Sequence, residues 1–325
     1  MRQRVLSGMR PTGPLHLGHL VGALKNWVDL QEKYDCFFMV ADWHALMSEY
    51  EKPGEIRQHS LQMVSDWIAA GVDPKRSVLF RQSDVPEHLE LYMVLSILAP
   101  LGWVERVPTY KEQLREVKGR DLATYGFLGY PVLQAADILL YKADAVPVGE
   151  DQIPHLELTR EIVRRFKFLY GADIFPEPKP LLTQEARLLG ADGRKMSKSY
   201  DNFIALSEDP DSIRKKVQKM VTDTKRIKMA DPGHPEECNT CHYWEVFAPE
   251  EKQRVWEECR TSQRGCTQNK QELAERVIKI TNQFRKERQA LPDPQVEKIL
   301  AEGAARARET AGRTMREVRK AVGLS

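Results

Sequence analysis

One short stretch near the N-terminus constrains the fold more than any other part of the chain. Residues 11–19 read Pro-Thr-Gly-Pro-Leu-His-Leu-Gly-His, between an apolar run at 4–7 and a segment of helical spacing at 20–28. The pattern predicts a turn from a strand into a helix, with glycines where the backbone must approach a ligand. Backbone N–H groups and the positive end of a helix favour phosphate at such a turn. We therefore expect His16 and His19 to face the phosphates of a nucleotide.

A second motif lies far downstream. Residues 195–199 read Lys-Met-Ser-Lys-Ser and follow Gly-Ala-Asp-Gly-Arg at 190–194. Two lysines, Lys195 and Lys198, in a glycine-flanked loop can swing onto a triphosphate. Either motif alone is weak, because a helix start with incidental histidines and a solvated basic loop explain them equally well. Together, in this order and at this separation, the two motifs predict an ATP site.

The alternation of apolar runs and helical patterns predicts the fold class. Continuous apolar runs at 36–41, 77–80 and 145–148 are typical of buried parallel strands. Helical patterns at 56–70 and 89–98 separate them, which favours an α/β fold with a doubly wound parallel sheet. Residues 42–44 and 81–84 follow two of the strands, at the edge where such sheets bind ligands. Beyond residue 200, charged helical patterns at 211–220, 270–290 and 292–322 replace the strands and predict an all-helical second domain.

Composition narrows the possible partners and compartments. The 325 residues carry a net charge of +2, so any nucleic-acid surface must be local. A basic group is a candidate contact for an RNA backbone, although a solvated helix face explains it equally well; it comprises 214–216, Lys219, Lys225, Arg226 and Lys228. The sequence has neither a long apolar run nor a signal-peptide pattern, so we expect a cytoplasmic protein without a membrane partner.

Two acidic sites stand out. Asp137 lies among apolar residues in a helical pattern at 130–141, where a carboxylate is costly unless it is paired. It is either a salt-bridged or capping residue or the acceptor for a donor on an apolar ligand, which fits an indole N–H. Residues 149–152, Gly-Glu-Asp-Gln, follow a strand; Asp151 suits ribose hydroxyls and Gln152 suits an amino-acid ammonium group. The same acidic residues also suit the cap of the helix predicted at 153–166, and the two roles are compatible.

Four late cysteines form a further pattern. Cys238 and Cys241 are spaced C-x2-C, and Cys259 and Cys266 follow them. Thiol sets of this kind bind zinc or an iron–sulfur (4Fe–4S) cluster, and four reduced thiols are the alternative. Cys36 lies in a predicted strand and is most simply a small core residue.

These motifs resemble those of the class I aminoacyl-tRNA synthetases. Along nearly the whole chain the sequence is similar to the bacterial tryptophan–tRNA ligases. The matching stretches are residues 7–8, 11–13, 16–19, 130–131, 135–139, 146–152 and 195–199.

The resemblance implies an organisation and a reaction. It implies a Rossmann-type catalytic domain over 1–200, ending in the 195–199 loop, and a helical anticodon-binding domain over 201–325 whose last helix packs back on the catalytic domain. It implies that a homodimer ligates L-tryptophan to tRNA(Trp) through tryptophanyl-adenylate, using ATP and Mg²⁺. The four cysteines correspond to a site that holds a 4Fe–4S cluster in some relatives, but Asn269 stands where those relatives have the last cysteine.

The resemblance also assigns roles to residues. The catalytic group comprises His16, His19, Lys111, Lys195 and Lys198. The ATP contacts fall on Arg10, Pro11, Thr12, Gly18, His19, Gly149, Glu150, Asp151, Leu188, Lys195, Met196, Ser197, Lys198 and Ser199. The tryptophan contacts are Asp137 with the indole nitrogen and Tyr130 and Gln152 with the amino group. One departure is Gln134, which stands where some relatives carry a methionine lining the indole pocket.

Three other functions compete with this hypothesis. A tyrosine–tRNA ligase is the nearest, but the chain lacks the RNA-binding extension of that group. A small nucleotidyltransferase would need neither the helical second domain nor the basic group. A catalytically silent paralogue acting as a partner protein would not need the intact lysines and histidines. ATP–pyrophosphate exchange dependent on a single amino acid separates all of these.

Overall fold

The computed structural model describes residues 2–108, 122–182 and 188–325, and the chain packs into two compact units. Unit 1 comprises Met1–Gly13, Trp27–Gln184 and Pro292–Ser325, and unit 2 comprises Pro14–Asn26 and Glu185–Leu291. These units group the chain differently from the predicted ranges 1–200 and 201–325, because the segment Pro14–Asn26 after the first strand belongs to unit 2. The last helix, which was predicted to pack back on the catalytic domain, belongs to unit 1.

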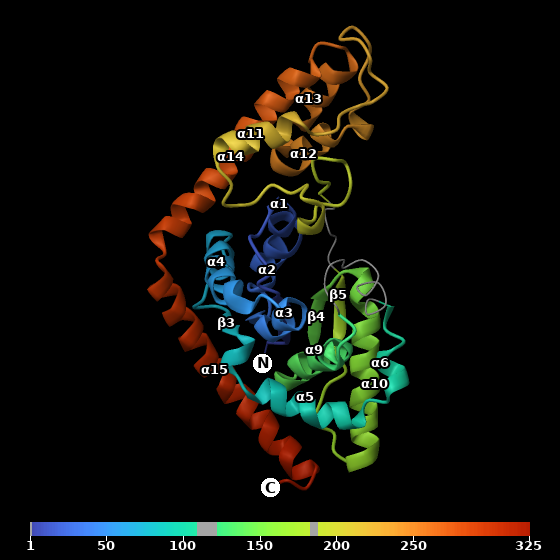
Figure 1. The fold of residues 1–325 in the computed structure, drawn as a ribbon, viewed down its shortest axis with the longest axis vertical. Coiled ribbons are helices and arrows are strands. Elements are labelled where there is room, and N and C mark those ends of the chain that lie inside the picture. The colour runs from blue at the N-terminus through green and yellow to red at the C-terminus, as the bar shows by residue number, and fades with distance from the viewer. Residues whose placement is uncertain (1, 109–121, 183–187) are drawn as a thin grey trace. The chain divides into compact units, whose positions relative to one another are not determined.

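A parallel five-stranded sheet forms the centre of unit 1 (Figure 1). Its order is β3-β2-β1-β4-β5, and the register pairs Val5 of β1 with Cys36 of β2 and with Ala145 of β4. The strands are β1 (Arg4–Met9), β2 (Asp35–Val40), β3 (Val78–Arg81), β4 (Ala145–Val148) and β5 (Lys179–Leu182). The predicted doubly wound parallel sheet is thereby confirmed.

Helices bury the sheet of unit 1. They are α3 (Asp42–Glu49), α4 (Ile56–Ala69), α5 (Glu87–Leu98), α6 (Leu101–Val104), α8 (Tyr125–Leu128), α9 (Tyr130–Leu140), α10 (Ile153–Tyr170) and α15 (Asp293–Ala321). Side chains of β1 to β4 form one large apolar core with α5, α9, α10 and α15. Because the central strands are covered on both faces, they are apolar throughout rather than alternating, and this made them recognisable in the sequence.

Strand β5 was not predicted from the sequence. Its residues, Lys-Pro-Leu-Leu, follow Pro178 and contain Pro180, a composition typical of a turn. Strand β5 lies at the edge of the sheet, where a proline is tolerated because one side of the strand makes no ladder hydrogen bonds. Because β5 lies at the edge, it can contain a proline that a central strand would not tolerate.

The carboxyl ends of the strands bring several predicted residues to one edge of the sheet. Strand β1 ends before Arg10, β3 before Gln82 and β4 before Gly149, and β2 ends at Val40, two residues before Asp42. The chain moves from β1 to β2 on one side and later to β4 on the other, so β1 and β4 flank the switch in strand order. Ligands of doubly wound sheets bind outside this edge, near that switch.

Helix α15 covers the opposite side of β3 from β2. The backbone at Gly303 approaches β3 so closely that a Cβ there would lie 1.7 Å from the carbonyl oxygen of Leu79. Arg306 Nη1 donates to the carbonyl of Ser77 at 3.2 Å. Leu79 and Ser77 are two residues apart, so their carbonyls point to the same side of the chain, away from the sheet. Helix α15 therefore shields the free edge of β3.

Unit 2 is largely helical. Its helices are α1 (Leu17–His19), α11 (Pro210–Gln218), α12 (Asn239–Phe247), α13 (Pro249–Arg260) and α14 (Cys266–Ala290), and α2 (Lys25–Leu30) joins it to unit 1. The N-terminal segment is held by a later one: Leu17 N donates to Ile204 O at 3.0 Å, and Leu206 N donates to Leu15 O at 2.9 Å. None of the helices in the described parts of the chain is long and apolar enough to cross a membrane.

Candidate active site

The two sequence motifs meet in unit 2. Gly18 lies in α1 beside the 195–199 loop, and a Cβ on Gly18 would lie 3.6 Å from the Sδ atom of Met196. The same Cβ would lie 3.1 Å from the ring of His16, so even alanine would crowd this turn. The predicted pairing of the motifs is thus present in the structure, although 177 residues separate Gly18 from Lys195.

The two histidine rings lie against each other at a tilt of 42° and are uncharged at neutral pH. The ring centroids of His16 and His19 lie 3.8 Å apart, and the backbone N–H of His16 donates to His19 Nδ1 at 3.2 Å. Burial, and next the charge of Lys198, lowers the pKa of His16 to about 4. Burial, His16 and Lys198 together hold the pKa of His19 well below its usual range. Because His19 Nδ1 accepts a hydrogen bond, its ring proton sits on Nε2, which makes Nε2 a donor.

A residue that the sequence analysis missed holds the lysine loop in shape. Asn202 Oδ1 accepts from the backbone N–H of Ser197 at 2.8 Å, and Asn202 Nδ2 donates to Asp192 Oδ1 at 2.7 Å and to Lys195 O at 3.1 Å. Asn202 also packs on Gly190, where an added Cβ would collide with its side chain. Lys195 itself is exposed, so its ammonium group is available to a ligand.

In unit 1, Asp137 lies buried on α9 at the centre of a hydrogen-bond network. Asp137 Oδ1 accepts from Gln82 Nε2 at 2.7 Å and contacts His88 Nδ1 at 2.6 Å. Asp137 Oδ2 contacts His44 Nε2 at 2.8 Å. Burial raises the pKa of the Asp137 carboxyl, but the hydrogen bonds from His44 and His88 outweigh burial and hold the pKa below its ordinary value. Asp137 is therefore a carboxylate at neutral pH.

Sequence reasoning found part of this network. His44 and Gln82 lie in segments that were predicted to reach the carboxyl edge of the sheet, although neither was assigned a role. His88 and Tyr141 were missed, and His88 Nε2 contacts the Tyr141 hydroxyl at 2.7 Å. A histidine in the apolar pattern of α5 was the available signal, but a buried histidine alone does not indicate which group it contacts.

The other predicted residues of unit 1 lie near the same edge. The Tyr130 hydroxyl lies 3.5 Å from His155 Nε2, and Gln152 Nε2 donates to Asp151 Oδ2 at 2.9 Å. Gly149 follows β4, and the short helix η4 (Glu150–Gln152) comes next. Residues 10–12 follow β1 directly. Lys111 lies outside the described residues, and Leu188 contacts the loop of unit 2, where its carbonyl accepts from Met196 N at 3.3 Å.

Three of the four late cysteines come together. Cys238, Cys241 and Cys259 form a buried cluster against Trp256, whereas Cys266, at the start of α14, is not part of it. Asn269 lies one turn after Cys266; its Nδ2 donates to Cys241 Sγ at 3.6 Å. Among the described residues, no group of three or more His, Cys, Asp and Glu side chains is arranged to hold a metal ion. The four cysteines as they stand do not fit the predicted four-thiolate centre.

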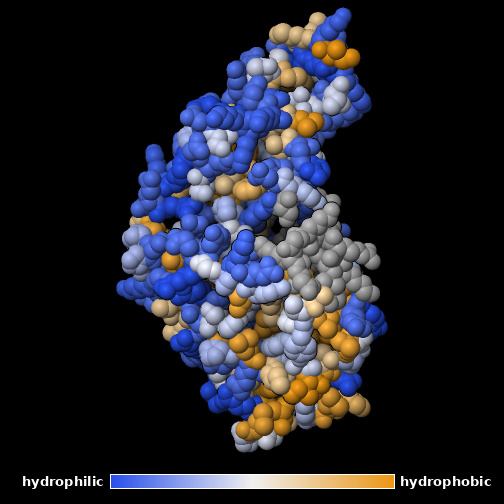
Figure 2. Space-filling view, in the orientation of Figure 1, coloured by the Kyte–Doolittle hydropathy of each residue, from blue (hydrophilic) through white to orange (hydrophobic). Residues whose placement is uncertain are grey.

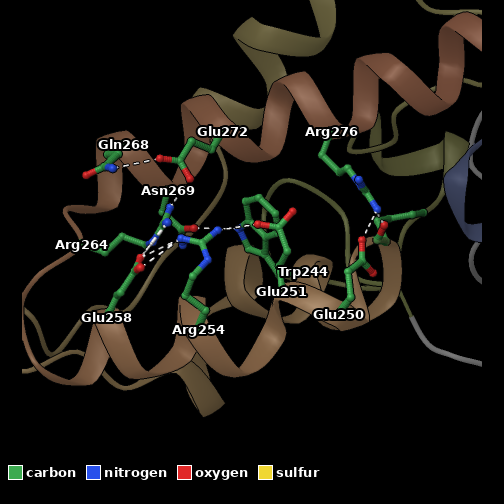
Figure 3. Close-up of polar contacts among 11 residues, drawn as sticks. Trp244, Glu250, Glu251, Arg254, Glu258, Arg264, Gln268, Asn269, Glu272 and Arg276 are labelled. Carbon is green, nitrogen blue, oxygen red and sulfur yellow. Dashed lines mark hydrogen bonds and ion pairs between the residues drawn. The ribbon is translucent and has the colours of Figure 1, made fainter.

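Figure 3 shows polar contacts among residues of α12, α13, α14 and the segment that joins α13 to α14. Trp244 Nε1 donates to Asn269 Oδ1 at 2.7 Å. Arg264 is 2% exposed and is paired with Glu258 at 2.7 Å and with Glu272 at 2.5 Å. Two carboxylates pair with the charge of the buried guanidinium, so this cluster connects the segment after α13 with α14.

The predicted basic group is only partly free for RNA. Arg214 pairs with Glu275 at 2.7 Å, Lys216 with Glu208 at 2.6 Å and Lys225 with Glu237 at 2.6 Å, while Arg226 donates to backbone carbonyls. Lys215, Lys219 and Lys228 are exposed. These three lysines are the stronger candidates for phosphate contacts.

Comparison with known proteins assigns the family. The family model described as "tRNA synthetases class I (W and Y)" matches residues 1–282. The chain belongs to this family. The resemblance inferred from the two motifs is confirmed, and the chain is a class I aminoacyl-tRNA synthetase.

Relatives match over the full length. A tryptophan–tRNA ligase of Thermotoga maritima is 48% identical, and one of Ralstonia nicotianae is 42% identical; in each case the match covers 99% of both chains. Among solved structures, a tryptophanyl-tRNA synthetase of Campylobacter jejuni in complex with ADP and tryptophan superposes with a TM-score of 0.91 at 35% identity, covering 99% of this chain and 100% of that one.

Proposed function

We propose that this synthetase ligates L-tryptophan to tRNA(Trp) through tryptophanyl-adenylate, with release of AMP and pyrophosphate. The observation that carries the proposal is the buried carboxylate of Asp137 at the carboxyl edge of the sheet. A carboxylate has about four acceptor positions, and Asp137 uses three of them, for Gln82, His88 and His44. One position on Oδ2 is left for the indole N–H. The names of the full-length relatives support the same amino acid.

The proposed chemistry requires no nucleophile from the protein. The carboxylate of tryptophan attacks the α-phosphorus of ATP and pyrophosphate leaves; a hydroxyl of the terminal adenosine of tRNA then takes the acyl group. Lys195 and Lys198 stabilise the charge that develops on the leaving pyrophosphate. Neutral His16 and His19 serve as hydrogen-bonding groups for phosphate oxygens. They are not general bases, because the attacking carboxylate has no proton to remove.

The residues assigned to the reaction are distributed over both units. Unit 1 carries the residues assigned to the amino acid, Asp137, Tyr130 and Gln152. It also carries the ATP residues that follow β1 and β4: Arg10, Pro11, Thr12, Gly149, Glu150 and Asp151. Unit 2 carries Gly18, His19, Leu188 and 195–199. Mg²⁺ is expected with ATP in this family and would be bound mainly by phosphate oxygens. Lys111 remains a predicted phosphate contact.

The hydrogen-bond donors and acceptors around Asp137 favour tryptophan over tyrosine as the substrate. The described hydrogen-bond donors around Asp137, on Gln82, His88 and His44, are directed at the carboxylate. A further acceptor, Gln82 Oε1, is buried with no partner among the described residues. The network thus offers acceptors, which suits an indole that can only donate. A phenol hydroxyl both donates and accepts, and would leave its own lone pairs without a donor.

A homodimer is part of the proposal. Large apolar side chains of α5, α6, α8 and α10 are exposed: Met93, Ile97, Leu101, Tyr125 and Phe168. In Figure 2 the lower end of unit 1, where Figure 1 places α5 and α10, carries much of the apolar surface. Exposed apolar patches on folded proteins mark interaction surfaces, and a second copy of the chain is the occupant we propose. We place the enzyme in the cytoplasm, where its tRNA substrate is used.

The metal centre stays a prediction of the sequence, and no step of the reaction is assigned to it. Purification without oxygen, followed by iron and zinc analysis and a visible spectrum, tests it. About four irons in a brown protein would indicate a cluster, and one zinc in a colourless protein a structural zinc site. Neither metal, with all four thiols titratable, would reject the site.

Amino-acid-dependent ATP–pyrophosphate exchange tests the proposed function. The protein is assayed with each standard amino acid in turn, followed by charging of tRNA(Trp). We expect exchange with tryptophan that exceeds exchange with any other amino acid. Exchange with tyrosine in preference to tryptophan would replace the proposed substrate. No exchange with any amino acid would reject the activity.

A further inference from the structure

A chain of buried hydrogen bonds connects Asp137 with His88 and Tyr141. It runs from the hydroxyl of Tyr141 to His88 Nε2, and from His88 Nδ1 to Asp137 Oδ1, with lengths of 2.7 and 2.6 Å. Tyr141 and His88 are each 0% exposed. Water therefore cannot replace any link of the chain, and each group depends on its neighbour for a partner.

The direction of each hydrogen bond follows from the groups at the two ends. Burial, followed by the charges of Asp137 and Glu87, raises the pKa of Tyr141 well above its usual value, so the phenol keeps its proton. The Asp137 carboxylate can only accept, so His88 donates to Oδ1 from Nδ1. His88 Nε2 is then the acceptor for the Tyr141 hydroxyl, and this second hydrogen bond holds the ring in the orientation in which Nδ1 faces Oδ1.

This chain of hydrogen bonds determines which oxygen atom of Asp137 is left for a ligand. Oδ1 receives two donors, from His88 and Gln82, and both of its acceptor positions are filled. Oδ2 receives one donor, from His44. Gln82 must present its NH₂ group to the carboxylate, because its carbonyl would be repelled there. The spare acceptor position is therefore on Oδ2, with the carboxylate rotation held by Oδ1.

We propose that His88 and Tyr141 are positioning residues for tryptophan selectivity, which fix the Asp137 carboxylate so that Oδ2 accepts the indole N–H. The proposal rests on the proposed function and deepens it. Neither residue touches the substrate in this account. Their packing is also defined: the Tyr141 ring stacks on Phe37 with centroids 4.7 Å apart and meets Phe80 edge-on at 5.4 Å.

The test compares tryptophan with an isostere that lacks the donor. In β-(3-benzothienyl)-L-alanine, sulfur replaces the indole N–H while the bicyclic shape is kept. Selectivity is the ratio of kcat/KM for tryptophan to kcat/KM for the isostere in ATP–pyrophosphate exchange. A hydrogen bond to a charged group is worth roughly tenfold or more in such a ratio, so loss of its alignment should be measurable.

The variants separate positioning from packing. Tyr141→Phe removes one hydroxyl and keeps the ring, and His88→Leu removes the donor to Asp137. We expect each to reduce selectivity by about tenfold, mainly through a higher KM for tryptophan, with little change for the isostere. His88→Asn keeps a donor at the position of Nδ1 and should recover part of the selectivity. The control is Phe80→Leu, which loosens packing against Tyr141 and should change both substrates equally.

The outcomes distinguish this inference from the proposed function. Equal losses for tryptophan and the isostere in Tyr141→Phe, or unchanged selectivity in both Tyr141→Phe and His88→Leu, would overturn the positioning role while leaving the tryptophan activity intact. Wild-type exchange that depends on another amino acid would overturn both. If His88→Leu does not fold, Tyr141→Phe alone decides, because it removes a single oxygen atom from the buried chain.

Discussion

The surroundings of Asp137 and His16 have opposite effects on the charge of the two side chains. Asp137 is held as a carboxylate by donors from His44 and His88, whereas burial keeps His16 uncharged. In the proposed site we therefore expect the positive charge for the phosphates to come from lysines and Mg²⁺ rather than from the histidine pair. Because both rings are uncharged, their centroids can lie 3.8 Å apart without repulsion between charges.

The lysine loop gives the first prediction. Lys195→Ala and Lys198→Ala should each slow adenylate formation by about 2–4 kcal/mol of transition-state stabilisation, because each removes a charge from the leaving pyrophosphate. Tryptophan binding should change little. Single-turnover adenylate formation and tryptophan titration measure the two effects. Lys279→Ala, an exposed lysine on α14, is the control, and near-wild-type rates for both loop variants would contradict the assignment.

The burial of His16 gives a prediction about pH and stability. Unfolded His16 binds a proton near pH 6.5, but the folded ring has a pKa of about 4, so the unfolded state binds more protons between these values. Stability should therefore fall as the pH drops from 6.5 to 4, by about 2–4 kcal/mol in total from this residue. Urea unfolding of wild type and His16→Gln over this range measures it. A constant difference between the two proteins across the range would disprove the linkage.

At the scale of elements, the backbone of α15 approaches the backbone of β3 closely at Gly303 and Leu79. Arg81 at the end of β3 pairs with Glu297 of α15 at 2.7 Å, and Arg319 of α15 pairs with Glu90 of α5 at 2.6 Å. These ion pairs are partly exposed and each contributes little. The close approach at Gly303 and the apolar face of α15 therefore carry most of the attachment.

Gly303→Ala tests that attachment. The new Cβ would lie 1.7 Å from the Leu79 carbonyl oxygen, which belongs to the backbone of β3 and cannot turn aside. We expect a loss of roughly 1–3 kcal/mol or more in the free energy of unfolding. Gly312→Ala, on the same helix, is the matched control, since its Cβ would meet only the end of Arg316 at 3.7 Å. The control should be stabilised by up to about 1 kcal/mol. Equal effects in denaturant unfolding would refute the close contact.

The elements that could be predicted from the sequence share a strong local pattern. The apolar run predicted at 36–41 became β2, and the helical patterns at 56–70 and 292–322 became α4 and α15, within two residues at each end. Strand β5 was missed because a proline such as Pro180 is tolerated in a strand mainly at an edge, and the position of a strand in the sheet depends on distant residues.

The candidate site could likewise be predicted only in part from the sequence. Asp137 could be selected because a carboxylate in an apolar helix is unusual. Its partners could not be chosen, since His44, Gln82 and His88 come from three separate segments that only the folded sheet brings together. Asn202 was missed for the same reason: an asparagine in a loop carries no sign of the three hydrogen bonds that it makes.

At the scale of the whole molecule, the exposed apolar surface of unit 1 bears on assembly. Ile97 on α5 is 71% exposed and Phe168 on α10 is 85% exposed. Neither contributes to the core of its own unit, so their exposure is unfavourable unless a partner covers them.

We therefore expect Ile97→Lys and Phe168→Lys to shift the proposed dimer to a monomer. Each places a charge where apolar surface would be buried between two copies. Sedimentation velocity or light scattering over a range of concentrations measures the shift. Ile227→Lys, which changes an 87% exposed residue of unit 2, is the control and should leave the assembly unchanged. A wild type that is monomeric at all concentrations would rule out the dimer.

The position of α15 also affects how the protein is made. A ribosome synthesises all five strands before it reaches Asp293. One side of β3 therefore stays open until α15 has been synthesised. An open strand edge can pair with a neighbouring chain and start aggregation. Nascent chains that stall before α15 emerges would thus be substrates for chaperones or proteases. The synthesis of α15 therefore covers the open edge of β3 and prevents aggregation through that edge.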